Sequence, residues 1–210
     1  ESVLTPFRNG EADILIGTQM IVKGHDFPNV TLVAALAADM SLYAGDYRSS
    51  ERTFELLMQA SGRAGRAEKA GEVVIQTYNP EEYSIQAVAG QDAEYFYENE
   101  LAFRRLMKYP PYSQMAAILI LSEEENEAKT LSEKLAENIH SVCGDAVTLI
   151  GPSKAGLSRA KDRYRYVLYV KSMDEEAMAC VREIAEEANR RVVNQKTCSV
   201  QYDRDPVNGY

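Results

Sequence analysis

The stretch Gln59-Ala60-Ser61-Gly62-Arg63-Ala64-Gly65-Arg66 lies at the end of a predicted helix over residues 50–62, through which apolar residues recur at helical spacing. If the helix continues, Gln59, Arg63 and Arg66 project from one face. Two guanidinium groups held in this way form a fork for a multiply charged anion. The alternative is a frayed, glycine-rich helix end with solvated arginines.

Three short apolar runs surround this helix and predict strands over residues 14–16, 31–37 and 72–77. The run at 31–37 is almost continuously apolar, which is typical of a strand in a sheet covered on both faces. The order strand, loop, strand, helix, strand fits part of a parallel α/β lobe. Because three strands are too few for a whole lobe, we expect an unfinished sheet with an exposed edge.

Residues 80–109 predict two helices separated by Gly90, and Pro110-Pro111 ends the second. The second helix carries an aromatic cluster that could stack on bases. We favour packing for this cluster, because the glutamates beside it would repel phosphates. Ser49 or Ser50 is expected to cap the helix over 50–62.

The pattern changes after residue 112. Strands are predicted over 115–121, 147–150 and 164–170, and a last half-buried strand contains Cys198, Val200 and Tyr202. Two amphipathic helices lie between them. The first follows Ser122-Glu123-Glu124-Glu125, which has capping-box spacing, and its apolar stripe is predicted from Ala128, Leu131, Leu135, Ile139 and Val142. The second is capped by Asp174. The sum is a βαββαβ α+β domain. We therefore divide the chain into residues 1–79, a helical linker over 80–111, and a C-terminal domain over 112–210.

Composition limits the possible functions. The 210 residues carry a net charge of −9, which argues against a general polyanion binder, so any DNA contact must come from local basic patches. No apolar run has transmembrane length, and no signal-peptide pattern or initial Met is present, so we expect a piece of a longer protein. Cys143, Cys180 and Cys198 show no Cys-x-x-Cys spacing, which favours reduced cysteines without a zinc site.

Seven segments together resemble one family. They are GTQMIVKGHDFPNVTLV (17–33), DYRSSER (46–52), QASGRAGR (59–66), GEVVIQTYNP (71–80), YPPYS (109–113), GPSKAGLSRAKDRYRYVLYVKS (151–172) and DRDP (203–206). The first and third are similar to motifs V and VI of superfamily 2 helicases, and the whole set resembles the PriA-type replication-restart helicases. The resemblance implies that the first segment of the chain is part of the second RecA-like helicase lobe.

This resemblance implies roles for the motif residues. Arg63 and Arg66 match the motif VI arginines, which stabilise charge on the transferring phosphate as arginine fingers, and Gln59 helps to order the nucleotide. Gly24 and Asp26 match the motif V element near the nucleotide. For Asp26 the alternative is a turn residue before Pro28.

Motif V also implies contacts with DNA. Gly17, Thr18 and Gln19 would donate backbone N–H and side-chain groups to a DNA phosphate, and Lys23 would add a further phosphate contact. Such contacts read no sequence, as suits a translocating motor.

A basic stretch with interleaved tyrosines suits single-stranded or branched DNA. Its cations are Lys154, Arg159, Lys161, Arg163, Arg165 and Lys171. Strand alternation puts Tyr164 and Tyr166 on one face and Arg163 and Arg165 on the other, so these tyrosines are predicted to be core. We predict DNA contacts for Arg159, Lys161, Arg163 and Arg165; the alternative is a strand whose basic residues are structural.

The leading hypothesis is the C-terminal part of an ATP-dependent 3′-to-5′ DNA helicase acting in replication restart and primosome assembly. The resemblance implies ATP and Mg²⁺ as cofactors of the whole protein, a zinc site whose ligands lie outside this chain, and a cytoplasmic, nucleoid-associated bacterial protein. Its implied partners are forked and single-stranded DNA, primosome proteins and single-stranded DNA-binding protein, with no membrane. The chain holds no G-x-x-x-x-G-K-[ST] loop, so alone it is predicted to be inactive. The alternative is a fork-DNA or partner-binding module with no catalytic role.

Overall fold

The computed structural model describes residues 4–18, 27, 29–43, 45–62, 71–194, 196–207 and 209–210. It divides into two compact units, residues 1–100 and 101–210. The division falls inside helix α4 (Ala93–Met107), within the predicted linker, so the division into three segments stays a prediction. No helix among the described residues is long and apolar enough to cross a membrane.

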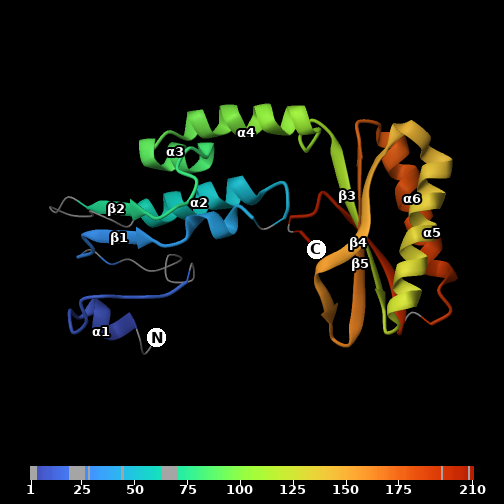
Figure 1. Cartoon of the computed structure of the whole chain (residues 1–210), viewed down its shortest axis with the longest axis horizontal. Coiled ribbons are helices and arrows are strands. Elements are labelled where there is room, and N and C mark those ends of the chain that lie inside the picture. Colours follow the sequence, from blue (N-terminus) through green and yellow to red (C-terminus); the bar gives the residue numbers. More distant parts are fainter. Residues whose placement is uncertain are drawn as a thin grey trace. The chain divides into compact units, whose positions relative to one another are not determined.

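The first unit contains a small parallel sheet with helices (Figure 1). Its elements are α1 (Leu4–Arg8), β1 (Leu32–Ala35), the 3₁₀ helix η2 (Ala38–Ser41), α2 (Ser49–Ser61), β2 (Glu72–Ile75), α3 (Tyr83–Gly90) and the start of α4. Strands β1 and β2 pair in parallel, with Leu32 opposite Glu72 and Ala35 opposite Ile75. The predicted parallel sheet is confirmed, and so is the strand, helix, strand part of the predicted order.

Two strand predictions for this unit were wrong. Residues 14–16 form no strand, and Ile14 and Ile16 are 77% and 87% exposed. Strand β1 is half-exposed, with Leu32 55% exposed, instead of covered on both faces. The physical reason is the same for both: an apolar run shows that a segment can be buried, but the described sheet of two strands offers no further strand to pair with and too little cover.

Helices α2, α3 and α4 supply the core of this unit. Phe54 and Leu57 of α2 pack with Ile85 of α3 and Phe96 of α4. The rings of Phe54 and Phe96 stack with centroids 4.1 Å apart, and Phe96 is only 1% exposed. In the aromatic cluster predicted on α4, Phe96 packs in the core and offers no platform to bases, so the packing prediction is confirmed for this residue. Tyr95, Tyr97 and Phe103 of the same cluster are 41%, 57% and 40% exposed. No serine caps α2, since Arg48 occupies the N-cap position without a side-chain hydrogen bond.

A buried carboxylate joins the ends of the two parallel strands. Asp39, at the start of η2 after β1, is 4% exposed. It accepts hydrogen bonds from Thr77 Oγ1 at 2.6 Å, Tyr78 N at 2.8 Å and Asn79 N at 3.3 Å, all just after β2. The Thr77 hydroxyl, then the Tyr78 amide, lower the pKa of Asp39.

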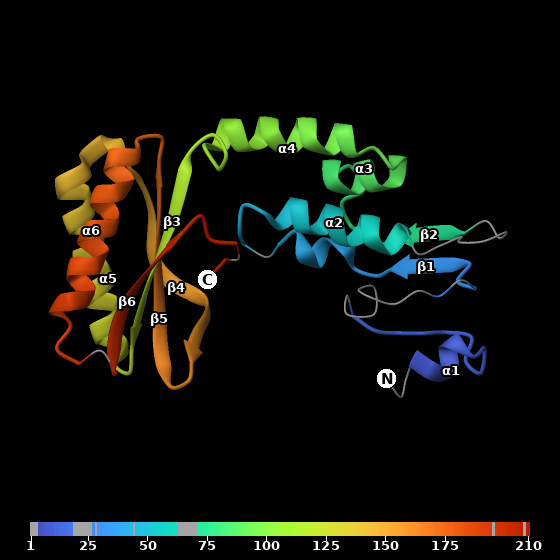
Figure 2. The same ribbon diagram turned by 180° about the vertical axis from the view of Figure 1, so that it is seen from behind.

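The second unit is a four-stranded antiparallel sheet with two helices on one face (Figures 1 and 2). Its elements are β3 (Gln114–Ser122), α5 (Glu125–Cys143), the 3₁₀ helix η3 (Gly144–Ala146), β4 (Thr148–Ala160), β5 (Arg163–Ser172), α6 (Glu175–Arg191) and β6 (Cys198–Arg204). The strand order is β4-β5-β3-β6. The predicted βαββαβ domain is confirmed.

The sheet has one face covered by helices and one open face. On the covered face, Ile118 of β3 and Leu168 of β5 are fully buried with Val181 of α6. Tyr166 belongs to the same cluster and Tyr164 packs against it, as the strand alternation predicted. On the open face a smaller cluster contains Ala117, Leu119, Ala155 and Val167.

In the second unit, one predicted helix cap forms and the other does not. Asp174 caps α6 as predicted, because its Oδ1 accepts from Glu176 N at 2.9 Å. Ser122 does not cap α5. It is buried at the end of β3, and its Oγ accepts from Glu124 N at 3.1 Å.

Two of the three cysteine thiols have a raised pKa. Burial first, then a hydrogen bond with Cys180, raise the pKa of Cys143 to about 11, and burial raises the pKa of Cys198. Both thiols therefore stay protonated near neutral pH. In the part of the chain that the structure describes, no three His, Cys, Asp or Glu side chains gather to hold a metal ion.

The helix-covered core gives a stability prediction. Ile139 on α5 is fully buried, whereas Val142, predicted on the same apolar stripe, is 58% exposed near the helix end. We expect Ile139→Ala to lower the free energy of unfolding by about 2–5 kcal/mol. Val142→Ala, the matched control one turn away, should change it by less than about 0.5 kcal/mol. Urea unfolding followed by circular dichroism measures both, and equal effects would contradict this core.

The carboxylate of Asp39 gives a pH prediction. Because its folded pKa is below the ordinary value of 3.8, its contribution is present above that pH and is lost as the pH falls through the folded pKa. Asp39→Asn should therefore lower the urea midpoint most near neutral pH, and the difference from wild type should shrink below about pH 4. Glu55→Gln, an exposed carboxylate on α2, is the control. A constant difference at all pH values would rule out the proposed linkage.

Candidate nucleic-acid interface on the antiparallel sheet

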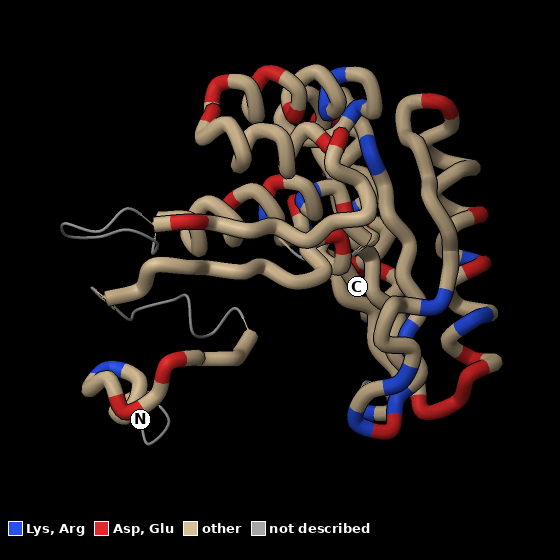
Figure 3. The backbone as a smooth tube through the Cα atoms, turned by 60° about the vertical axis from the view of Figure 1, so that its left-hand side comes forward, with Lys and Arg blue, Asp and Glu red and all other residues tan. Residues whose placement is uncertain are grey.

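The β4–β5 hairpin carries the basic stretch and ends in a two-residue turn. Ala160 pairs with Arg163, and the turn residues Lys161 and Asp162 both have positive φ, 51° and 59°. Two such residues in succession are the signature of a type I′ turn, whose twist matches that of the strands it joins. Basic residues gather along this hairpin and its tip (Figure 3).

The register of the sheet brings three distant segments together on the open face. Arg165 of β5 lies opposite Leu121 of β3. In the next row of the same face, Val167 lies opposite Leu119, which lies opposite Gln201 of β6. Alternation along β5 keeps Arg163 on the same side as Arg165. The two arginines thus flank an apolar strip with an amide at its far edge.

A cavity of about 540 Å³ lies at this place. The described residues that line it are three cations, one amide, one phenol ring and three apolar side chains: Lys161, Arg163, Arg165, Gln201, Tyr210, Leu119, Leu121 and Ala160. No Asp or Glu side chain is among them. The lining can therefore hold an anion against its cations and an apolar or aromatic group against its leucines.

Among the described residues, Arg163 and Arg165 are oriented by hydrogen bonds to backbone carbonyls and not by ion pairs with carboxylates. Arg165 Nη1 donates to the carbonyl oxygen of Leu157 at 3.1 Å, and Arg163 Nη2 donates to the carbonyl oxygen of Lys196. These acceptors are neutral, so they orient the guanidinium groups but do not neutralise them. The remaining N–H donors of each fork are available to a phosphate.

Residue 210 crosses the open face and forms one wall of the cavity. Its carbonyl accepts from Gly156 N at 2.8 Å, its N–H donates to Tyr169 Oη at 2.9 Å, and its Oη donates to Asp203 Oδ2 at 2.5 Å. Burial first, then the bond to Asp203, raise the pKa of Tyr210 to about 12. Hydrogen bonds at both ends fix the position of this ring.

The other cations of the basic stretch are engaged elsewhere. Lys154 pairs with Glu125 at 2.6 Å, which raises the pKa of this lysine. Lys171 is 9% exposed, donates to Met107 O at 2.9 Å, and has its pKa lowered by burial and then by Lys108.

Arg159, one of the four predicted DNA contacts, lies apart from the other three. It pairs with Tyr164 in the hairpin register, and its guanidinium lies 5.3 Å from the centroid of that ring. It also forms an ion pair with Asp162 at 3.4 Å. The structure therefore brings Lys161, Arg163 and Arg165 together, and Arg159 belongs to the opposite side of the hairpin.

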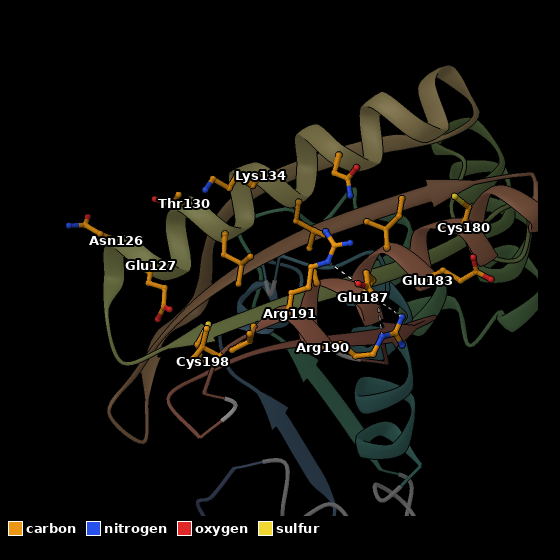
Figure 4. A pocket seen from close by; sticks show the side chains of 17 residues that line it. Asn126, Glu127, Thr130, Lys134, Cys180, Glu183, Glu187, Arg190, Arg191 and Cys198 are labelled. Atoms are coloured by element: carbon orange, nitrogen blue, oxygen red, sulfur yellow. Dashed lines mark hydrogen bonds and ion pairs between the residues drawn. The ribbon is translucent and has the colours of Figure 1, made fainter.

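A larger cavity of about 1080 Å³ lies between α5 and α6 (Figure 4). Its two arginines, Arg190 and Arg191, both bind Glu187 at 2.8 Å. Glu127 and Glu183 also line it, against the single further cation Lys134 among its described lining residues. Because its charges are balanced internally, this cavity is a weaker phosphate site than the one on the open face.

The motif residues lie in the first unit, and the structure describes few of them. Gly17 and Thr18 are exposed in an irregular segment, and Gln59 is exposed on α2, two residues before that helix ends. Gly62 N donates to Met58 O at 3.0 Å just after the helix. Gln19, Lys23, Gly24, Asp26, Arg63 and Arg66 lie outside the described residues, so their roles stay predictions.

Sequence reasoning missed the non-basic half of the cavity. The predicted strand over 115–121 contains Leu119, and Gln201 lies between Val200 and Tyr202 of the last predicted strand, but sequence reasoning assigned neither residue a role in binding. Local pattern cannot show that they meet Arg165, because their meeting depends on the register of β6 and β5 with β3. The nearest signal was the alternation of β6, which put Gln201 on the face opposite Val200.

Comparisons with known proteins agree with both units. Residues 105–207 match the family described as "Primosomal protein N C-terminal domain", and residues 1–68 match "Helicase conserved C-terminal domain". The Replication restart protein PriA of Bacillus subtilis is 46% identical over 206 residues, 98% of this chain and 26% of that protein.

Other relatives of the same name are more distant. The PriA of Synechocystis is 42% identical over 170 residues, 81% of this chain and 20% of that protein. The PriA of Chlamydia trachomatis is 33% identical over 208 residues, 99% of this chain and 27% of that protein. The chain thus spans about a quarter of the length of these curated relatives. Since the similarity extends over both units, the chain belongs to the PriA family of replication restart proteins.

Proposed function

We propose that the chain is the C-terminal part of an ATP-dependent 3′-to-5′ DNA helicase that acts in replication restart and primosome assembly at stalled forks. The helicase match over residues 1–68 and the order β1–α2–β2 support the motor half. The observation that carries the DNA-binding half is the cavity lined by Lys161, Arg163 and Arg165, whose arginines are oriented by neutral carbonyls.

In the motor half, α2 leads into the stretch that contains Arg63 and Arg66. We assign these arginines to the charge that develops on the transferring phosphate, and Gln59, exposed on the last turn of α2, to the nucleotide beside them. Gly24 and Asp26 are assigned to the same nucleotide. When bound, ATP with Mg²⁺ supplies the phosphoryl-transfer chemistry; the chain has no phosphate-binding loop, so by itself it should not turn ATP over.

The first unit also has a proposed DNA contact. Gly17, Thr18 and Gln19 would donate hydrogen bonds to a backbone phosphate, with Lys23 beside them. Because this segment comes before β1 and the arginines follow α2 in the same unit, lobe motion driven at the nucleotide would move the DNA contact as well.

The second candidate function is a module that binds fork DNA or a protein partner and has no catalytic role of its own. One observation favours it: the basic cavity lies wholly within the second unit, so it needs no nucleotide to form. For the whole protein we propose primosome proteins and single-stranded DNA-binding protein as partners, zinc ligands outside this chain, and a place at the bacterial nucleoid.

The motor role predicts a loss of turnover. In the full-length protein, Arg66→Ala and Arg63→Ala should each lower DNA-stimulated ATP hydrolysis by roughly three to five orders of magnitude, because each removes an arginine finger. Binding of a labelled fork, measured by anisotropy, should change little. Arg190→Ala is the control. Wild-type turnover in both finger variants would refute the assignment, and turnover by the 210-residue chain alone would refute its predicted inactivity.

The DNA-binding role predicts a change in salt dependence. Arg163→Ala with Arg165→Ala should weaken fork binding by this chain and reduce the slope of log K against log salt by roughly one for each lost phosphate contact. Arg190→Ala with Arg191→Ala removes the same charge from the cavity between α5 and α6 and should leave the slope nearly unchanged. If the two pairs behave alike, the effect comes from net charge and the cavity is not the contact.

A further inference from the structure

The cavity on the open face contains more than a phosphate needs. Phosphate binding would use Lys161, Arg163 and Arg165, yet Leu119 and Leu121 form part of the same lining. Leu119 is only 5% exposed and belongs to the small cluster beneath the open face. The DNA backbone alone would make no favourable contact with these leucines. The lining therefore indicates a ligand that carries a less polar group as well as its phosphates.

We propose that this cavity receives the base of one unpaired nucleotide of single-stranded DNA, whose flanking phosphates lie on Arg163 and Arg165. This inference rests on the proposed DNA binding by the same cations and deepens it by naming the ligand as single-stranded. The volume of about 540 Å³ falls within the range of roughly 300–1,000 Å³ that is typical of small-ligand pockets. The cations and the leucines thus serve different parts of one nucleotide.

Gln201 supplies the polar contact that a base edge requires. Its side chain is exposed, and it lies directly opposite Leu119 in the register of β6 with β3. A primary amide both donates and accepts hydrogen bonds, and it can turn over to match either pattern. The site should therefore accept all four bases with little preference.

Tyr210 supplies an aromatic wall that is already in place. Its backbone and its hydroxyl are held by Gly156, Tyr169 and Asp203. A ring fixed at both ends loses little conformational freedom when a base packs against it. Base–aromatic contacts are tolerant of sequence, because every base has a π-face.

A paired base does not fit this arrangement. In a duplex the base is stacked and paired, so placing it in the cavity would require it to leave the helix at a cost in free energy. An unpaired nucleotide at a fork or in a single strand avoids most of that cost. The cavity should therefore distinguish single-stranded from duplex DNA, which the cations alone could not do.

The test uses the 210-residue chain and fluorescence anisotropy with three probes of equal length. They are fluorescein-labelled (dT)₁₂, a fully abasic 12-mer and a blunt 12-base-pair duplex. Gln201→Ala should weaken (dT)₁₂ binding by roughly fivefold, as loss of one hydrogen bond does, and leave the abasic and duplex probes unchanged. Gln201 is exposed, so the variant should fold, and thermal unfolding by circular dichroism checks this.

Ser199→Ala is the matched control, two residues away on the same face of β6. Its hydroxyl is buried and has no hydrogen-bond partner among the described residues, so its removal should be neutral for binding. Gln201→Glu should weaken (dT)₁₂ binding more than Gln201→Ala, because it adds a carboxylate beside the cations.

The outcomes separate this inference from the proposed function. If (dT)₁₂, the abasic 12-mer and the duplex bind equally well and Gln201→Ala has no effect, DNA binding stands and the nucleotide pocket is overturned. If wild type binds none of the probes at low salt, the proposed DNA binding fails as well. If an Asp-rich decapeptide displaces (dT)₁₂ at equal concentration and Gln201→Ala weakens the peptide equally, the ligand is an acidic peptide and the inference is wrong.

Discussion

Strand β5 is paired on both sides, with β3 and with β4, so its register is held from two directions. Every second side chain along it, from Tyr164 to Val170, packs toward the helices. The side chains between them must lie on the open face. A shift of the strand register by one residue would move every core side chain to the solvent side. The positions of Arg163 and Arg165 follow from the burial of Leu168 and its neighbours.

Local charge outweighs net charge in this protein. The chain carries a net charge of −9, yet no Asp or Glu side chain is among the described residues that line the cavity on the open face. Many acidic residues lie on helices such as α6, where Glu187 forms ion pairs with Arg190 and Arg191. Screening limits the reach of surface charges to roughly 8–10 Å at moderate salt, so a DNA strand at the cavity would sense its three cations, with Asp162 and Asp203 close by, more strongly than the acidic helices.

The first unit shows a different balance. Asp39, which follows β1, accepts hydrogen bonds from the residues after β2, and Phe54 stacks on Phe96 in the core. Large apolar side chains such as Ile16 and Leu36 nevertheless remain exposed. Exposed apolar surface of this kind is typical of a face that packs against another domain. This pattern agrees with the proposal that the first unit is one lobe of a larger helicase.

The sequence by itself determined the kinds of elements and the family, because periodicity, caps such as Asp174 and the motif stretches are local in the chain. It also placed Tyr166 in the core and Arg163 and Arg165 on the other face of the same strand. It failed for residues 14–16 and for Val142, where burial depends on what else is near. Only the tertiary structure decided which cations act together. Lys171 turns inward, Lys154 meets Glu125, and Gln201 joins Arg165, because strand register and hairpin geometry bring together residues that no local pattern connects.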